Sequence, residues 1–345
     1  MRAAEILIYS GIFIASYIGV GFFRRWSSRR GILDVPNERS SHTQPTPRGG
    51  GLIIVLISLG FYFFYTVFYT QTFWWNYFAG ALLVATVSWL DDLFSISFLW
   101  RFLIHIAAAT VVLMDFPGFE AENFPLFAPE NLKIYGVVLT GLWIVWMTNA
   151  FNFMDGIDGI AGLQAVTAGA GWMLAGAILH SPTAAVFGGV LAAASLGFLF
   201  YNWHPARIFM GDVGSAFLGY SFGVLPILAF RENPAGVANY RLYLFVGAAL
   251  VWGFFFDTIL TVLRRIFHGE KIWTAHRRHI YQQLIQNGRS HRFAAVFYAL
   301  LSVMTGGMLI ARLLDYRLTT LIYIFIVFES IMLTASPFLF RIVKR

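Results

Sequence analysis

The sequence contains no cysteine, and only 12% of its 345 residues are charged. Without cysteine the chain forms no disulfide and no thiolate metal site, so a bound metal must be held by oxygen or imidazole ligands. Oxygen ligands favour Mg²⁺, with Mn²⁺ as an alternative. Soluble domains carry about 25% charged residues, whereas this chain is 58% hydrophobic. The composition therefore excludes an ordinary soluble domain and predicts an integral membrane protein.

Two nucleotide-binding motifs are missing as well. The glycines at 49–51 do not belong to a GxxxxGK[ST] loop, and GIDGIAG at 156–162 spaces its glycines as GxxGxxG rather than GxGxxG. The net charge of +7 does not indicate a nucleic-acid partner, because arginines in a membrane protein report the orientation of its loops. We find no internal repeat and no low-complexity tract, so we expect one transmembrane domain over residues 1–345.

What the chain has instead is a series of apolar segments of about 20 residues, the length that a helix needs to cross the hydrocarbon core. The segments lie near 4–23, 51–70, 74–90, 99–116, 133–150, 161–179, 183–201, 215–230, 242–267, 293–312 and 318–338. They are continuously apolar rather than alternating, which excludes an outer-membrane barrel. We therefore predict an all-α polytopic bundle of about 11 transmembrane helices (10–11).

Lysine and arginine are divided unequally between the two faces that these spans define. An odd number of spans puts the termini on opposite sides, and 18 of the 24 basic residues then fall on one face and 6 on the other. The richer face is expected to be cytoplasmic, with the N-terminus outside and the C-terminus in the cytoplasm. The cytoplasmic loops are predicted near 24–50, 91–98, 151–160, 202–214 and 268–292.

The segment NAFNFMDGIDGIAG (149–162) is the first candidate for a functional site. Asn149 and Asn152, and then Asp155 and Asp158, are three residues apart, a spacing that puts side chains on one face of a helix. Polar groups between two apolar segments are typical of a site for a metal or for phosphates. A turn at Asp155 and a helix N-cap at Asp158 would explain the same residues without a ligand.

Two further acidic motifs fall at the ends of predicted spans. Asp91 and Asp92 end the third span, where adjacent like charges are costly unless a cation or phosphate chemistry uses them. A stop signal at the membrane surface is the alternative. Asp212 lies between glycines in NWHPARIFMGDVGS (202–215). An aspartate in that setting caps a helix or holds a hard cation, and Asn202 adds an amide.

Basic residues gather in two loops. His276, Arg277 and His279 lie in AHRRHIYQQL (275–284), where arginines interleaved with histidines favour an anion site for phosphates or a nucleotide. Contact with lipid headgroups would explain the same loop. The first loop adds three candidates for phosphate contact, which are Arg39, His42 and Arg48.

Asp257 lies inside the ninth predicted span, about two turns before Arg264 and Arg265. A carboxylate within a membrane span is a candidate for function. A buried partner for an arginine is the other interpretation.

Together these motifs place acidic clusters and basic loops on one membrane face. Carboxylates hold a divalent cation, the cation holds a pyrophosphate, and arginines and histidines hold the rest of an anionic substrate. A lipid substrate would explain why such a site lies at the bilayer surface.

The motifs VPNERSSHTQPTPRGGG, WLDDL, NAFNFMDGIDGIAG, NWHPARIFMGDVGS and AHRRHIYQ occur in this order between about residues 30 and 290. They resemble those of the polyprenyl-phosphate N-acetylhexosamine-1-phosphate transferase superfamily, glycosyl transferase family four. The resemblance implies an Mg²⁺-dependent enzyme of the bacterial inner membrane, with its active site facing the cytoplasm. Such an enzyme moves a sugar-1-phosphate from a UDP-N-acetylhexosamine to undecaprenyl phosphate and releases UMP.

The resemblance also implies roles for particular residues. The predicted catalytic residues are Asp91, Asp92, Asp155 and Asp158, and the predicted metal ligands are Asp212 and Asp155. The predicted substrate-binding residues are Asn149, Asn152, Asn202, His276, Arg277, His279, Arg39, His42 and Arg48. A single displacement by the lipid phosphate and a two-step route through an aspartyl-phosphate are both compatible with these residues.

Two departures from the family pattern bear on the substrates. Ser40 and Gln44 stand where many relatives carry lysine, so any phosphate contact by those lysines is absent. The residues His279-Ile280-Tyr281-Gln282 replace the HIHH of N-acetylglucosamine enzymes. They are more like the O-antigen initiators that use N-acetylfucosamine or N-acetylquinovosamine. The donor stays open among UDP-GlcNAc, UDP-FucNAc or UDP-QuiNAc, and UDP-MurNAc-pentapeptide, of which the last fits less well.

A membrane transporter is the rival from another class, because ionisable residues in a helical bundle are typical of transporters too. Transporters place those residues near the bilayer midplane and often contain repeated halves. Here the acids lie at the ends of spans on one face, and we find no repeat. The sequence is compatible with a homodimer but does not fix the oligomeric state.

Overall fold

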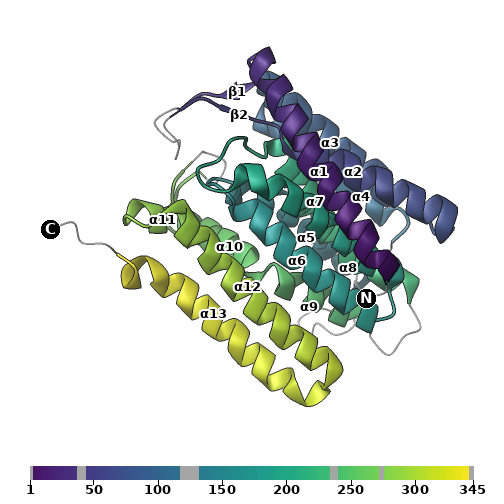
Figure 1. Cartoon of the computed structure of the whole chain (residues 1–345). Coiled ribbons are helices and arrows are strands. Elements are labelled where there is room, and N and C mark those ends of the chain that lie inside the picture. Colours follow the sequence, from purple (N-terminus) through teal and green to yellow (C-terminus); the bar gives the residue numbers. More distant parts are fainter. Residues whose placement is uncertain (1–2, 37–43, 117–131, 234–239, 272–275, 342–345) are drawn as a thin grey trace.

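The computed structural model describes residues 3–36, 44–116, 132–233, 240–271 and 276–341 (Figure 1). Over these residues the chain forms a helical bundle with one small hairpin. The elements are α1 (Ala3–Arg30), β1 (Leu33–Asp34), β2 (Thr46–Pro47), α2 (Gly51–Phe64), η1 (Tyr65–Tyr69), α3 (Trp75–Phe94), α4 (Phe98–Leu113), α5 (Leu132–Met154), α6 (Ile160–Ile178), α7 (Pro182–Asn202), α8 (Asp212–Glu232), α9 (Tyr240–Leu250), α10 (Trp252–Phe267), α11 (Ile280–Gln286), α12 (His291–Leu314), η3 (Tyr316–Leu318) and α13 (Thr319–Leu339).

The architecture is that of an all-helical membrane protein with several spans. Within the described residues, nine helices are long and apolar enough to cross a bilayer, and the α9–α10 pair would make a tenth. All eleven predicted apolar segments are helical, but α4 has only 16 residues, fewer than the roughly 20 that a span needs. The count of eleven and the orientation in the membrane stay predictions.

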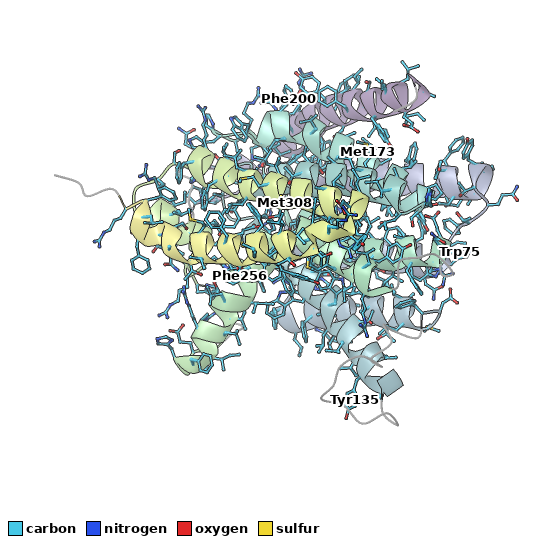
Figure 2. The ribbon with its side chains drawn as sticks, turned by 90° about the horizontal axis from the view of Figure 1, so that it is seen from below. Trp75, Tyr135, Met173, Phe200, Phe256 and Met308 are labelled. Atoms are coloured by element: carbon cyan, nitrogen blue, oxygen red, sulfur yellow. The ribbon has the colours of Figure 1, made fainter. Side chains whose placement is uncertain are left out.

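Our prediction of one continuous span over 242–267 is wrong. Helices α9 and α10 meet at Val251 with a bend of 83°, and Figure 2 shows α10 pointing away from the bundle below Phe256. The polar residues of α10 explain the break. Asp257 is buried and accepts hydrogen bonds from the first residues of α11. A straight span would carry this carboxylate away from its partners and towards lipid, where unpaired polar groups are costly.

The centre of the bundle is α8, which is buried along almost its whole length and packs against α3 and α5. Glycine allows the close approach, because a Cβ on Gly219 would lie 2.3 Å from the carbonyl oxygen of Met147 on α5. Small residues at helix contacts are how membrane helices gain packing when lipid is as apolar as their side chains. The helices α1 and α13 lie at opposite edges and keep most of their side chains on the outside (Figure 1).

The polar motifs gather at one end of this bundle, where the first loop is fixed by backbone hydrogen bonds. The N–H of Phe209 donates to the oxygen of Pro47 at 2.8 Å, and the N–H of Gly50 donates back to the oxygen of Phe209 at 3.0 Å. The N–H of Gly51 donates to the oxygen of Met210 at 2.8 Å. These bonds hold β2 beside the loop that precedes α8.

Replacing Gly169 by valine should destabilise the bundle. A Cβ at this position of α6 would lie 2.6 Å from the carbonyl oxygen of Gly188 on α7, and overpacking of this kind costs about 1–3 kcal/mol. We expect Gly169→Val to lower the melting temperature of the detergent-solubilised protein. Gly307→Val on α12 is the control, because nothing lies within 4 Å of its Cβ position. Equal shifts in the two variants would contradict the packing argument.

Candidate functional site

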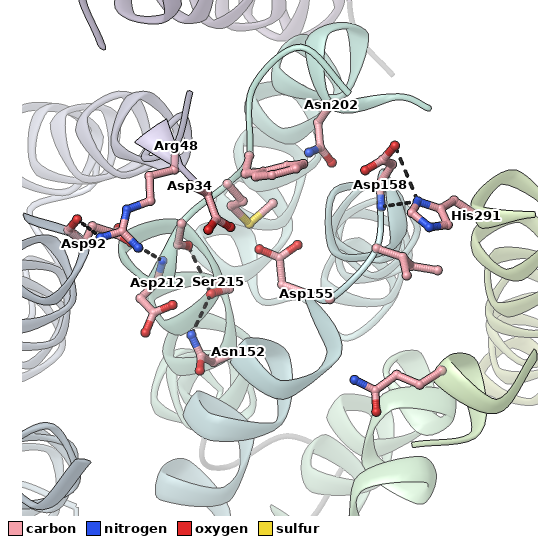
Figure 3. A pocket seen from close by; sticks show the side chains of 16 residues that line it. Asp34, Arg48, Asp92, Asn152, Asp155, Asp158, Asn202, Asp212, Ser215 and His291 are labelled. Carbon is pink, nitrogen blue, oxygen red and sulfur yellow. Dashed lines mark hydrogen bonds and ion pairs between the residues drawn. The ribbon is translucent and has the colours of Figure 1, made fainter. Parts of the chain in front are cut away.

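A cavity of about 290 Å³ opens at the end of the bundle where the polar motifs gather. Its walls come from the ends of α3, α5, α7 and α8 and from the loop that precedes α6 (Figure 3). The charged and polar lining residues are Asp34, Arg48, Asp92, Asn152, Asp155, Asp158, Asn202, Asp212, Ser215, Gln282 and His291. Five carboxylates therefore meet in one small polar space with a single arginine among the lining residues.

Seven of the predicted site residues line this cavity, namely Arg48, Asp92, Asn152, Asp155, Asp158, Asn202 and Asp212. Asp91 is not among the lining residues, and its carboxylate pairs with Arg101. The amide of Asn149 donates to the oxygen of Val145 at 2.7 Å within its own helix and does not reach the cavity. The predicted contacts of Arg39 and His42 lie outside the described residues.

Asp92 fixes the start of α8. Its two carboxylate oxygens accept hydrogen bonds from the N–H groups of Asp212 at 3.0 Å and Val213 at 3.1 Å, where the positive end of the helix favours a negative charge. Gly211 has a φ of 77°, and a Cβ there would lie 2.5 Å from Asp92 Oδ2. Only glycine permits this approach. The guanidinium of Arg48 donates to the backbone oxygen of Asp92.

Arg101 joins two acids from different helices. Its Nη1 donates to Asp91 Oδ2 and to Asp212 Oδ2, so one cation reaches a carboxylate of α3 and a carboxylate of α8. Sequence reasoning counted Arg101 only as one of the basic residues of the richer face. Its position just inside an apolar segment was the signal that could have singled it out.

Asp155 is the acid that points into the open cavity (Figure 3). Among the described residues we find no hydrogen-bond donor to its carboxylate. Burial raises the pKa of Asp155 well above its usual value, and the charges of Asp212, Asp92 and Asp158 raise it further. A carboxylate in such a setting favours a bound proton or a bound cation.

Asp158 has the opposite environment, although it is only three residues further along. Its Oδ2 lies 2.6 Å from His204 Nδ1 and 3.4 Å from His291 Nδ1, and it accepts a hydrogen bond from the N–H of Ala206 at 3.1 Å. Burial raises the pKa of Asp158, but these partners more than offset that effect and hold it below the usual value. Asp158 thus joins the loop before α6 to the α7–α8 loop and to α12.

The interpretation of Asp158 as a helix N-cap is wrong, because Gly159 occupies that position of α6 without a side-chain cap. Asp158, His204 and His291 also have the composition of a metal site. The short distance between Asp158 and His204 is that of a hydrogen bond, however, and an ion would have to break it.

The two predicted amides at the cavity are also held in place. Asn202 Oδ1 accepts from the N–H of Gly159 at 2.9 Å, and its Nδ2 donates to the oxygen of Ile208 at 3.0 Å. Asn152 Nδ2 donates to Ser215 Oγ at 3.1 Å. These bonds tie the loop before α6 and the end of α5 to the loop and helix that carry Asp212.

Comparison with known proteins agrees with these motifs. Residues 74–230 match glycosyl transferase family 4. The chain is 32% identical to the probable undecaprenyl-phosphate N-acetylglucosaminyl 1-phosphate transferase of Bacillus subtilis, over 79% of this chain and 75% of that protein. This chain belongs to glycosyl transferase family 4. The predicted membership of the polyprenyl-phosphate sugar-1-phosphate transferases is confirmed.

Two further relatives extend the comparison. The decaprenyl-phosphate N-acetylglucosaminephosphotransferase of Mycolicibacterium smegmatis is 30% identical over 95% of this chain and 87% of its own length. A shorter match, to the phospho-N-acetylmuramoyl-pentapeptide-transferase of Solibacter usitatus, is 36% identical over 39% of this chain and 38% of that protein.

The histidine loop does not reach the cavity in the way that the family resemblance led us to expect. His276, Arg277 and His279 are not among the lining residues, and Gln282 is the residue from this region that lines the cavity. Burial lowers the pKa of His276 to about 4, with nearby His279 and Arg265 adding to the effect. The His276 ring is therefore neutral at pH 7 and offers no cation to a phosphate.

Asp257 is the partner that holds this loop. Its Oδ1 accepts from the N–H of Ile280 at 2.9 Å and lies 3.2 Å from His279 Nδ1, and its Oδ2 accepts from the hydroxyl of Tyr298 at 2.7 Å. The partner of Asp257 is thus a histidine and the start of α11, rather than an arginine. The hydroxyl of Tyr281 continues the connection by donating to the oxygen of Phe153 at 3.0 Å.

Sequence reasoning missed several lining residues. Asp34 was not selected, since it belongs to none of the clusters on which the sequence analysis was built. Ser215 belongs to a motif that was chosen for its aspartate. His291 starts α12 outside every motif, and nothing in the sequence points to its contact with Asp158.

The residues present fit the Mg²⁺ that family membership suggests. The donor groups are carboxylate and amide oxygens, which are the ligands that Mg²⁺ prefers. The bridge from Arg101 places the carboxylates of Asp91 and Asp212 within reach of one cation. Asp155 opens into the same cavity as Asp212 without a hydrogen-bond donor among the described residues.

Replacing Asp155 and Asp158 by asparagine should change stability in opposite directions. The raised pKa of Asp155 means that its charged form destabilises the fold above about pH 4, the ordinary pKa of an aspartate. Asp155→Asn should therefore raise the melting temperature at pH 7 in buffer with EDTA, and the gain should disappear towards pH 4.

The lowered pKa of Asp158 has the reverse consequence. The ionised Asp158 stabilises the fold above about pH 4, and this contribution is lost as the pH falls through the lower pKa of the folded state. Asp158→Asn should lower the melting temperature at pH 7. Thermal unfolding of both variants in detergent checks the pair, and shifts of the same sign would show that the two environments do not differ as described.

Proposed function

We propose that this protein transfers N-acetylhexosamine-1-phosphate from a UDP-sugar to undecaprenyl phosphate, releasing UMP and forming an undecaprenyl-diphospho-sugar. The observation that carries the proposal is the cavity in which Asp155 and Asp212 lie with Arg48 at the ends of membrane helices. Carboxylates in this cavity can bind a divalent cation that in turn binds the pyrophosphate of the donor. The position of the cavity at the end of the bundle is suitable for a lipid acceptor whose hydrocarbon chain stays in the bilayer. The names of the relatives support the same class of transfer.

Different residues of the cavity have different roles in this proposal. Arg48 is placed to hold a substrate phosphate, because its guanidinium is kept at the cavity wall by the backbone of Asp92. Asp212 and Asp155 would hold Mg²⁺, which when bound neutralises negative charge on the pyrophosphate. Asp92 acts as a positioning residue, since its bonds to the first turn of α8 fix the place of Asp212.

The acceptor needs little help from a base. The second pKa of a phosphate monoester is about 6, so the lipid phosphate is mostly a dianion at pH 7. One of its oxygens forms a bond to the β-phosphorus of the donor, and the bond from that phosphorus to the UMP oxygen breaks. We favour this single displacement over an aspartyl-phosphate because Asp91 is held by Arg101 and Asp92 by α8. Neither carboxylate stands free as a nucleophile, and Asp155, the carboxylate without a hydrogen-bond donor among the described residues, is assigned to the metal.

We place the reaction on the cytoplasmic side of a bacterial inner membrane, on the strength of the 18 basic residues that the predicted topology puts there. It would be the first membrane step of O-antigen or another cell-envelope polysaccharide. The names of the relatives favour UDP-GlcNAc as the donor. The AHRRHIYQ motif keeps UDP-FucNAc and UDP-QuiNAc in the set to be tested, together with UDP-MurNAc-pentapeptide.

Purified protein incubated with undecaprenyl phosphate, Mg²⁺ and a panel of these UDP-sugars should release UMP. EDTA should abolish the release, and Asp212→Asn should lower its rate by about 100-fold or more, as expected for a group that positions charge in the active site. Asp315→Asn, an exposed acid after α12, is the control. Release of UDP would mean that the sugar alone is transferred and would contradict the proposal. If no donor gave a product while a solute crossed proteoliposomes, a transporter would be favoured instead.

Replacing Arg101 by glutamine should strengthen metal binding. The guanidinium competes with a divalent cation for Asp91 and Asp212, and removing a competing charge at about 4 Å is worth about 1–4 kcal/mol. We expect Arg101→Gln to bind Mn²⁺ about tenfold more tightly, as measured by electron paramagnetic resonance without substrates. Arg207→Gln, an arginine that lies on Tyr201, is the control. Unchanged or weaker binding in Arg101→Gln would show that Arg101 does not compete with the metal for Asp212.

A further inference from the structure

A second cavity, of about 340 Å³, lies between α10 and the segment that leads into α11. Its lining includes Arg264, His268, Arg277, Arg278 and Gln286, and it contains no acid. It shares no lining residue with the cavity of the candidate active site. A pocket of arginines, a histidine and amides is suited to an anion that carries several oxygen acceptors.

The positive charge of this second cavity is only partly balanced. Arg278 Nη1 pairs with Glu270 Oε1 at 2.5 Å, and Glu270 is shared with Arg265 at 3.3 Å. Among the described residues, we find no acid paired with Arg264. The cavity therefore keeps at least one guanidinium for an external anion.

The wall formed by the segment before α11 is held by amide side chains. Gln286 Nε2 donates to the oxygen of Arg277 at 2.9 Å, and Gln283 Nε2 donates to the oxygen of Arg278 at 2.8 Å. Both arginines thus project from a backbone that is fixed to α11. The cavity is consequently a built feature of the fold rather than a chance gathering of surface arginines.

The other face of α10 shows where the anion would come from. Thr261, Arg264 and His268 share one face of the helix by their spacing of three and four residues. On the other side, Leu263 and Ile266 expose apolar side chains, and Phe267, three residues after Arg264, is 84% exposed beside the basic face. A helix with one apolar and one basic face lies at a membrane surface, with its basic side among the headgroups. The 83° bend at Val251 turns α10 away from the direction of α9.

We propose that the cavity between α10 and α11 binds the phosphate group of an anionic phospholipid from the leaflet on the side of the candidate active site. The phosphodiester accepts hydrogen bonds from Arg264 and the arginines before α11. The acyl chains enter the bilayer beside α10. Basic residues at a membrane surface are attracted to anionic lipids. The exposed apolar face of α10 favours a lipid over free phosphate as the ligand. If this face contacts the bilayer, the cavity lies beside the lipid headgroups.

The test uses the full-length protein in detergent and a short-chain lipid that dissolves as a monomer. Dihexanoyl phosphatidylglycerol is titrated by microscale thermophoresis, with dihexanoyl phosphatidylcholine and inorganic phosphate as comparison ligands. We expect phosphatidylglycerol to bind wild-type protein in preference to both. Arg264→Gln should weaken its binding about tenfold, which corresponds to about 1.4 kcal/mol. Arg264→Lys should recover part of the loss, because lysine keeps the charge without the fork of donors.

Controls separate a local effect from misfolding. Arg312→Gln removes an arginine from the last turn of α12, which does not line the cavity, and should leave lipid binding unchanged. Thermal unfolding without lipid should give similar melting temperatures for all variants. The assay measures no sugar transfer, so a failure here is distinguishable from a failure of the proposed function.

Three results would overturn the proposal. Equal affinity of wild type and Arg264→Gln for phosphatidylglycerol would show that Arg264 does not hold the headgroup. Equal affinity for phosphatidylcholine would show that the net charge of the lipid is not recognised. Inorganic phosphate that displaces phosphatidylglycerol at a comparable concentration would make this a site for a soluble anion.

Discussion

The repulsion among aspartates at one end of the bundle is the constraint on which the rest of the site depends. Asp91 and Asp92 arrive on α3, Asp155 follows α5, and Asp212 starts α8, and like charges brought together away from bulk water raise one another's energy. The fold meets this cost in two ways. The first turn of α8 binds the Asp92 carboxylate, and Arg101 stands between Asp91 and Asp212. Asp155 is left without such compensation, and the cavity opens at that uncompensated charge.

The central motif shows how far spacing alone can specify chemistry. Asp155 and Asp158 are equivalent in the pattern, but their environments differ because the partners of Asp158 come from elsewhere in the chain. His204 is 46 residues away, and His291 belongs to α12. The two explanations that the sequence left open, a ligand site and a structural loop, turn out to describe different aspartates. Asp155 faces the cavity, and Asp158 holds three segments together.

The helices were predictable, because the length of the apolar segments specifies membrane spans. The gathering of the polar motifs at one end of the bundle was predictable as well, because the motifs lie at the ends of those segments. The break at Val251 was not predictable from hydropathy, since it depends on bonds between Asp257 and the start of α11. The position of the histidine loop was likewise not predictable, and the loop was expected to contribute to the substrate site. Its motif indicates anion binding, but only the fold directs Arg277 into a second cavity. Arg101 was missed because its function depends on the acids that packing brings to it.

A short series of hydrogen bonds connects α10 and α11 to the end of α5. Asp257 on α10 binds His279 and the N–H groups that begin α11, and Tyr281 then reaches the oxygen of Phe153, two residues before Asp155. These hydrogen bonds can hold the end of α5 in one fixed conformation, so their effect does not require a conformational switch. The bond from Tyr281 restricts the end of α5, two residues before Asp155, and a charge that binds a pyrophosphate gains from being held in advance. Helix α10 therefore acts as a brace for the end of α5, because it holds the start of α11 and Tyr281 of α11 holds the oxygen of Phe153.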